Sequence, residues 1–165
     1  MNRSNEAQNR QTAVALLRIT LGVIILVTWY GNVKSGIYTA DGLTGFFNWL
    51  FDSNGNGSSL GWYKAFLDSA IVPIAGAFGA MQLVGELLLG LALLLGAFTR
   101  LFGVIGMFFF ANLFLSYFGG HEWIWTYVLL FMSSLTVFLS SAGRVWGVDQ
   151  WLLQKRSNSK LALLW

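Results

Sequence analysis

Residues 69–98 read SAIVPIAGAFGAMQLVGELLLGLALLLGAF, an apolar run whose single charged side chain is Glu86. A helix needs about 20 such residues to cross the hydrocarbon core of a bilayer. Three further apolar runs are long enough to do the same, at about residues 13–33, 101–118 and 123–142. No alternation of polar and apolar residues is sustained, which disfavours a transmembrane barrel. The sequence therefore predicts an all-α fold, an integral membrane bundle of four transmembrane helices.

The composition of the chain supports this prediction. Of its 165 residues, 56% are hydrophobic and only 10% are charged, whereas a soluble domain carries roughly 25% charged residues. Too few charges remain to cover a globule in water, and the length suits one domain, residues 1–165. The chain has no cysteine, so it supplies no disulfide and no thiolate to a metal or iron–sulfur centre. Its basic residues are scattered around the apolar runs, which argues against nucleic-acid binding.

The distribution of lysine and arginine predicts the orientation in the membrane. Only Lys34 and Lys64 fall in the loops on one side. The other basic residues fall at the termini, just inside the first span, or in the turn between the second and third spans: Arg3, Arg10, Arg18, Arg100, Arg144, Lys155, Arg156 and Lys160. Because positive charge favours the cytoplasmic side, we expect both termini in the cytoplasm. The first span is too long for a signal peptide, so we expect it to be retained.

The first outer loop, residues 34–68, is unusually long and aromatic. Its aromatic residues are Tyr38, Phe46, Phe47, Trp49, Phe51, Trp62, Tyr63 and Phe66. Amphipathic rings favour the headgroup layer, so we expect interfacial segments here. Residues 43–51 are predicted to form a short helix that ends at the turn residues 54–57. The loop is either a connector lying on the membrane or a lid over a site that opens toward the outer leaflet.

The cytoplasmic tail, residues 143–165, is predicted to hold a second interfacial segment. Asp149 is expected to be a helix N-cap. Trp146 and Trp151 are expected at the level of the inner headgroups. The basic residues that follow can then meet anionic lipid: Lys155, Arg156 and Lys160.

Polar side chains inside the predicted spans mark a candidate site. An ionisable group in hydrocarbon costs at least ~2.5 kcal/mol, so Glu86 is expected to have a specific role there. At the rise of a helix, Glu86 lies about 18 Å from the inner end of its span and Asn112 about 16 Å from the inner end of the next. Ser133 and Ser134 are central in the fourth span. The sequence therefore predicts a buried polar centre in the bundle.

Two further residues extend this candidate site. Arg18 lies about 8 Å above the start of the first span, and its side chain is long enough to reach up to Glu86 or down to the inner headgroups. Gln82 lies one turn outward from Glu86 on the same helix face. We predict Glu86 and Arg18 as catalytic residues, and Glu86, Gln82, Asn112 and Arg18 as cofactor-binding residues. In one interpretation these groups only pair and fix helix packing. In the other, Glu86 binds, or exchanges a proton with, a polar headgroup such as a quinone carbonyl.

The chain offers few metal ligands. His121 is its one histidine, beside Glu122 in the short outer loop, and there is no cysteine. A haem or metal centre usually needs several protein ligands, so we predict no metal or haem held by this chain alone. Any electron transfer then needs bound quinone or a partner that carries the redox centre.

Several short segments carry a family resemblance. In chain order they are LRITLG (17–22), WYGNVK (29–34), QLVGELLLG (82–90), GAFTR (96–100) and AGR (142–144), with Asp149 after them. Together they resemble the DoxX/DoxD family of small four-helix membrane proteins, over a match of about Leu16 to Leu152.

The resemblance implies a membrane subunit of a quinone-linked oxidoreductase. The family includes the large membrane subunit of thiosulfate:quinone oxidoreductase, known as DoxD, which implies quinone as the cofactor and a separate partner subunit outside the membrane. By position, Arg18, Glu86, Arg100, Arg144 and Asp149 match the family pattern, and Glu86 is the best site candidate. The resemblance also implies a bacterial or archaeal plasma membrane.

The sequence is also compatible with two other functions. An accessory or scaffold subunit of a larger respiratory or photosynthetic complex would be non-catalytic. It would use the aromatic faces at residues 108–110, Phe114 and Phe118 to contact partner helices, lipids or pigments. A small proton-coupled transporter would use Glu86 as a proton relay, although the sequence has no evident inverted repeat.

Overall fold

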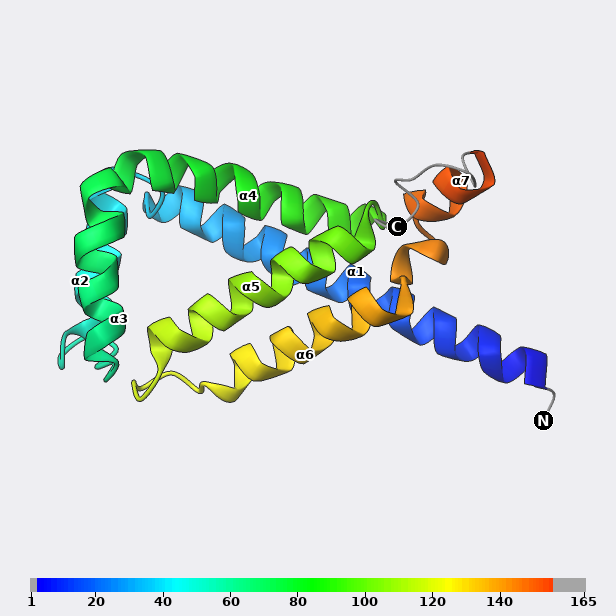
Figure 1. Ribbon diagram of the computed structural model, residues 1–165, viewed down its shortest axis with the longest axis horizontal. Helices are drawn as coiled ribbons and strands as arrows, with labels where there is room; N and C mark the ends of the chain where they lie inside the picture. Colours follow the sequence, from blue (N-terminus) through cyan, green and yellow to red (C-terminus); the bar gives the residue numbers. More distant parts are fainter. Residues whose placement is uncertain (1–2, 156–165) are drawn as a thin grey trace.

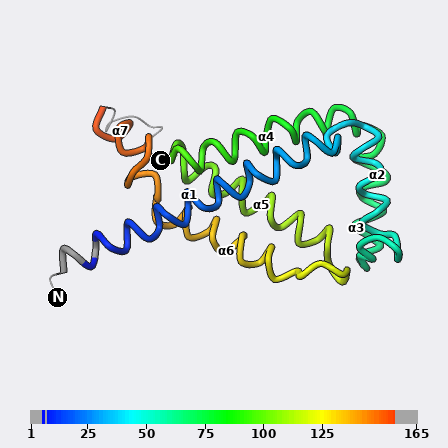
Figure 2. The backbone as a smooth tube through the Cα atoms, turned by 180° about the vertical axis from the view of Figure 1, so that it is seen from behind, coloured from blue at the N-terminus to red at the C-terminus, as the bar shows by residue number. Residues whose placement is uncertain are grey.

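Four long helices run along one axis of the molecule (Figure 1). The computed structural model describes residues 3–155. Its long helices are α1 (Arg3–Ser35), α4 (Ala75–Leu95), α5 (Thr99–Tyr117) and α6 (Trp125–Ser140). α1 packs along α4 and α5 packs along α6. The two pairs diverge toward the end that carries residues 36–74, which is the outer end of the predicted topology (Figures 1 and 2).

The long helices agree closely with the predicted spans. Three of them are long and apolar enough to cross a membrane, over Gln8–Ser35, Gly61–Leu95 and Thr99–Tyr117. α6 is also apolar but shorter, at 16 residues. The elements of residues 3–155 are all helical, so the all-α prediction is confirmed, and the long apolar helices support the prediction of a membrane protein.

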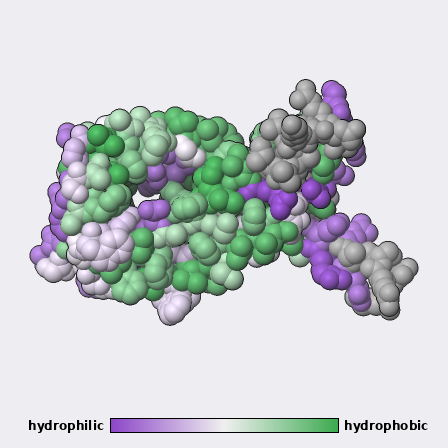
Figure 3. Space-filling view, viewed as in Figure 1, coloured by the Kyte–Doolittle hydropathy of each residue, from purple (hydrophilic) through white to green (hydrophobic). Residues whose placement is uncertain are grey.

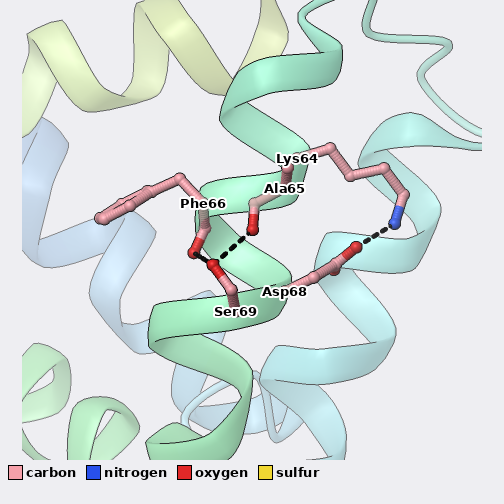
Figure 4. A network of polar contacts seen from close by, with 5 residues as sticks. All are labelled: Lys64, Ala65, Phe66, Asp68 and Ser69. Atoms are coloured by element: carbon pink, nitrogen blue, oxygen red, sulfur yellow. Dashed lines mark hydrogen bonds and ion pairs between the residues drawn. The ribbon is translucent and has the colours of Figure 1, made fainter.

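Within the second span, Gly61–Leu95, the regular helix α4 begins later than the predicted residue 69 because the chain bends ahead of it. Residues 69–74 do not belong to α4. A short helix α3 (Gly61–Phe66) continues through one π-helical turn (Leu67–Ile71) and one 3₁₀ turn (Val72–Ile74) before α4 starts. Pro73 cannot donate a backbone hydrogen bond, which favours a bend at this point. Beside the bend, Lys64 pairs with Asp68 (Figure 4).

The aromatic loop forms a roof across the outer end. Its helix α2 (Ala40–Phe51) begins at Thr39, whose hydroxyl oxygen accepts a hydrogen bond from the Gly42 amide at 3.1 Å. α2 and α3 lie across the long helices rather than along them (Figure 1). The apolar face of α2 is buried through Leu43, Phe47 and Leu50. The predicted short helix is therefore confirmed.

Two apolar clusters hold the bundle together. The inner one joins the four long helices and the start of the tail: Leu21, Ile25, Leu89, Leu93, Phe110, Val137 and Ala142. The outer one joins the roof to the beginning of α4: Leu43, Phe47, Leu50, Tyr63, Leu67 and Ala75. Along α4, Glu86 lies between the members of these clusters. A cavity lies at the level of Glu86.

The tail folds back onto the inner end of the bundle. A 3₁₀ turn (Ala142–Arg144) leads to α7 (Val148–Lys155). The prediction that Asp149 caps its own helix is wrong. Its buried carboxylate instead accepts hydrogen bonds from the amides of Phe98 at 2.6 Å and Thr99 at 2.9 Å, at the start of α5. The predicted lipid contacts of Arg156 and Lys160 lie outside the described residues.

Candidate functional site

Arg18 belongs to the inner end, not to the site around Glu86. Its side chain is fully buried and donates to the carbonyl oxygens of Ala142 at 3.4 Å and Trp146 at 3.0 Å. Within residues 3–155 no ion pair joins it to Glu86. The prediction that it reaches Glu86 is therefore wrong; the side chain points to the inner end, the other predicted direction, but it is buried there and does not reach the headgroups. Two carbonyls from the folded-back tail satisfy the guanidinium instead.

Arg18 and Asp149 form an inner polar cluster with Thr99, whose hydroxyl donates to Asp149 at 2.7 Å. Gly96 lies against this cluster with φ of +69°, and a Cβ added there would lie 1.7 Å from Arg18 Nη1. Several residues that carry the family resemblance thus meet at one place. They connect the first span, the turn between α4 and α5, and the tail. The contacts of this cluster are structural.

Glu86 lies on α4 and is 5% exposed. The Tyr38 hydroxyl donates to Glu86 Oε2 at 2.7 Å, and Gln82 Nε2 donates to Glu86 Oε1 at 3.0 Å. The expected proximity of Gln82 and Glu86 is confirmed. Both donors are neutral, so this carboxyl is stabilised by hydrogen bonds rather than by a positive charge.

Tyr38 is a site residue that the sequence analysis missed. It lies in the turn between α1 and α2, and Asn32 Nδ2 donates to its hydroxyl oxygen at 3.4 Å. Burial and the hydrogen bond to Glu86 raise the pKa of Tyr38, which keeps the phenol protonated as a donor. A Cβ at Gly79 would lie 2.2 Å from the Tyr38 carbonyl oxygen. Gly79, Gln82 and Glu86 share one face of α4. The glycine on this face is the feature of the sequence that could have indicated the close approach of another backbone segment, here the one at Tyr38.

A cavity of about 710 Å³ lies between the diverging helix pairs and under the roof. Glu86 and Gln82 line it from α4, Asn112 lines it from α5, and Tyr38 and Tyr63 line it from the outer end. Most of the other lining side chains are apolar. Figure 3 shows a hollow with hydrophilic surface in this region, next to the hydrophobic surface that covers the middle of the molecule. The structure thus brings together three of the four predicted site residues, and Arg18 is not among the residues that line the cavity.

Asn112 forms a second polar group in the cavity. Its Oδ1 accepts from the Tyr63 hydroxyl at 3.2 Å, and its Nδ2 donates to the carbonyl of Phe108 at 2.8 Å. Ser133 and Ser134 were expected in the same polar centre, but neither lines the cavity. The Ser133 hydroxyl donates to the carbonyl one turn earlier in α6, at Leu129, and Ser134 is buried against the neighbouring helices.

The outer loops hold the only histidine of the sequence. His121 is exposed, and its Nδ1 lies 3.2 Å from the Gly55 carbonyl oxygen. In the described part of the chain, no three His, Cys, Asp or Glu side chains gather into a possible metal site.

The site can therefore hold a largely apolar molecule that carries hydrogen-bonding groups. Its volume is within the usual range of ligand pockets, about 300–1,000 Å³. Glu86 can accept a hydrogen bond, or donate one when protonated. Among the described residues that line the cavity, none is lysine or arginine. The lining thus suits a neutral headgroup better than an anionic one.

Comparison with known proteins places the chain in a family. No curated protein and no solved structure matches it. A family model described as "TQO small subunit DoxD" matches residues 14–165, which corrects the expectation that DoxD is the large subunit. This match covers nearly the whole sequence, including α4 with Glu86 and the inner polar cluster. The chain belongs to the DoxD family.

Proposed function

We propose that this chain is a quinone-binding membrane subunit of an oxidoreductase, with the quinone headgroup in the cavity beside Glu86. The observation that carries the proposal is the cavity itself, a largely apolar space with one buried carboxyl on its wall. A water-soluble substrate would lose its hydration in such a space, whereas a lipid quinone is already in an apolar medium.

The cavity is open to the hydrocarbon side of the bundle. On α4 and α5, three of its apolar lining residues are also exposed: Met81 at 59%, Ile105 at 40% and Phe108 at 67%. They lie on α4 and α5, which diverge at this level (Figure 1). A quinone can therefore enter sideways from lipid, while the roof of α2 and α3 covers the cavity on the outer side.

Glu86 supplies the chemistry of the site in this proposal. Its carboxyl can accept a hydrogen bond from a quinol hydroxyl, or donate one to a quinone carbonyl when it is protonated. Tyr38 and Gln82 hold both carboxyl oxygens in place. A bound quinone would supply the two-electron redox chemistry. The electrons would come from a partner subunit with its own redox centre, in an enzyme of the thiosulfate:quinone type.

The proposed membrane placement includes all four long helices. α6 is about 24 Å long at the rise of a helix, a few ångströms less than the hydrocarbon core. Local thinning of the bilayer, or tryptophans at its ends, compensates for such a mismatch. Trp123 and Trp125 at the outer end of α6 are both exposed. With the positive charges inside, both termini lie in the cytoplasm of a bacterial or archaeal cell.

A second function, a non-catalytic accessory subunit, is favoured by a different feature. A shallow apolar groove of about 320 Å³ lies between α5 and α6. Its lining is aromatic and aliphatic: Phe110, Ala111, Phe114, Leu115, Tyr127, Val128 and Phe131. Such a surface can pack against a helix of another membrane subunit.

Gentle purification from native membrane, followed by mass spectrometry of bound lipids and proteins, tests the proposal. We expect stoichiometric quinone with the wild type and its loss in Glu86→Gln. Glu122→Gln is the matched control, since it makes the same change in an exposed loop, and it should retain quinone. A large complex in which this chain holds no quinone would refute the proposal and favour the accessory function.

A further inference from the structure

The cavity holds two separate polar groups, and the proposed function uses one of them. The first, on α4, consists of Gln82 and Glu86 with Tyr38. The second consists of Asn112 on α5 with Tyr63 on α3. We infer that Asn112 and Tyr63 recognise the far oxygen of the bound ring, so that the site selects a ring with two oxygens at opposite ends. This inference rests on the proposed quinone function and names what determines its specificity.

The Asn112 side chain has unused hydrogen-bonding groups with which it can bind a ligand. A side-chain amide has two N–H donors and one carbonyl acceptor with two lone pairs. One Asn112 donor is used by the Phe108 carbonyl, and the oxygen accepts one bond from Tyr63. One N–H and one lone pair remain, on a side chain that lines the cavity. The bond from Tyr63 fixes the orientation of the amide.

The first polar group has the same dual capacity. Gln82 uses one N–H for Glu86, which leaves its second N–H, and each oxygen of Glu86 accepts one hydrogen bond from the protein. Each group thus combines donors with acceptors. A quinone presents two acceptors and a quinol presents two donors, so a site of this composition can bind both forms of the couple.

Other membrane lipids fit this arrangement less well. A fatty acid or phospholipid carries its polar atoms at one end and would leave the second polar group without a partner. An anionic headgroup would also lie near Glu86 with no lysine or arginine in the described lining. A neutral ring between α4 and α5, with its tail leaving past Met81 and Phe108, satisfies both polar groups.

Ring isomers with the same tail test this inference. The full-length protein in detergent would be titrated with decyl-1,4-benzoquinone, decyl-1,4-hydroquinone, the 1,3-dihydroxy isomer (a decylresorcinol) and a decylphenol with one hydroxyl. Binding would be followed by quenching of tryptophan fluorescence and checked by equilibrium dialysis. We expect the two 1,4 compounds to bind about tenfold tighter than the other two, which is the effect of about one hydrogen bond.

Variants then assign the preference to the second polar group. Asn112→Leu should weaken binding of the 1,4 compounds about tenfold and leave the monohydroxy phenol unchanged, so that the preference disappears. Tyr63→Phe, which removes only the hydroxyl that orients Asn112, should reduce the preference severalfold and serves as a second, milder variant. Ser133→Ala is the control, because this residue lies outside the cavity.

The outcomes separate this inference from the proposed function. If wild type binds all the ring compounds equally, or if Asn112→Leu keeps the full preference, two-ended recognition is wrong while quinone binding at Glu86 stands. If no ring compound binds to wild type, both proposals are wrong.

Discussion

The inner polar cluster makes a strong prediction about stability. Asp149 is fully buried and accepts three hydrogen bonds, from two amides at the start of α5 and from the Thr99 hydroxyl. It also interacts electrostatically with the buried guanidinium of Arg18. Asp149→Ala removes all of these contacts at once and leaves the guanidinium without its nearby negative charge.

These contacts determine how much free energy of unfolding is lost in Asp149→Ala. A hydrogen bond to a charged group contributes about 1.5–3 kcal/mol, so three bonds together contribute at most about 4.5–9 kcal/mol. Water can enter the space left by the carboxylate, and the first turn of α5 can fray, which lowers the effect. Removing one partner of a buried charge pair costs about 3–5 kcal/mol, and we expect a loss of free energy of unfolding in that range.

Unfolding in mixed micelles, with increasing mole fraction of a denaturing detergent, measures this free energy through tryptophan fluorescence. Asp68→Ala is the control, since it removes an exposed ion pair with Lys64 worth about 0–1 kcal/mol. Asp149 does not line the cavity, so the folded fraction of Asp149→Ala should still bind quinone with wild-type affinity. A change below about 1 kcal/mol would refute the structural role, and a loss of quinone affinity in folded protein would refute the separation of the two sites.

Two further predictions concern the turn that holds Tyr38. Gly79→Ala should weaken quinone binding severalfold in a binding titration, because the new Cβ would lie 2.2 Å from the Tyr38 carbonyl oxygen and push the phenol away from Glu86. Gly76→Ala is the control, since the nearest atom to its Cβ is 3.8 Å away. Burial and Glu86 raise the pKa of Tyr38 in the folded protein. The protonated phenol therefore stabilises the fold fully below the unfolded pKa of about 10, and this stabilisation is lost as pH rises through the folded pKa. Melting temperatures from pH 8 upward should therefore fall more steeply above pH 10 for wild type than for Tyr38→Phe, and parallel curves would contradict this.

Some features of this protein follow from short-range sequence patterns. A span needs only a run of apolar residues, and all four predicted runs became helices. Gln82 and Glu86 meet because residues four apart share a helix face. α2 formed where an aromatic run precedes the turn residues 54–57. Each of these predictions depends on residues within one continuous segment, so the rest of the chain has little influence on it.

The site and the inner polar cluster depend on contacts that no local pattern specifies. Arg18 reaches a carbonyl 128 residues away, Tyr38 reaches Glu86 across 48, and Asp149 reaches Thr99 across 50. Such pairs depend on how each helix is rotated and tilted about its axis, and on where the tail folds back. Depth along a helix could be counted from the sequence, which is why Glu86 and Asn112 were expected near one level. The partner of Arg18 could not, because a long side chain has several polar groups within reach and the packing of the whole bundle selects among them.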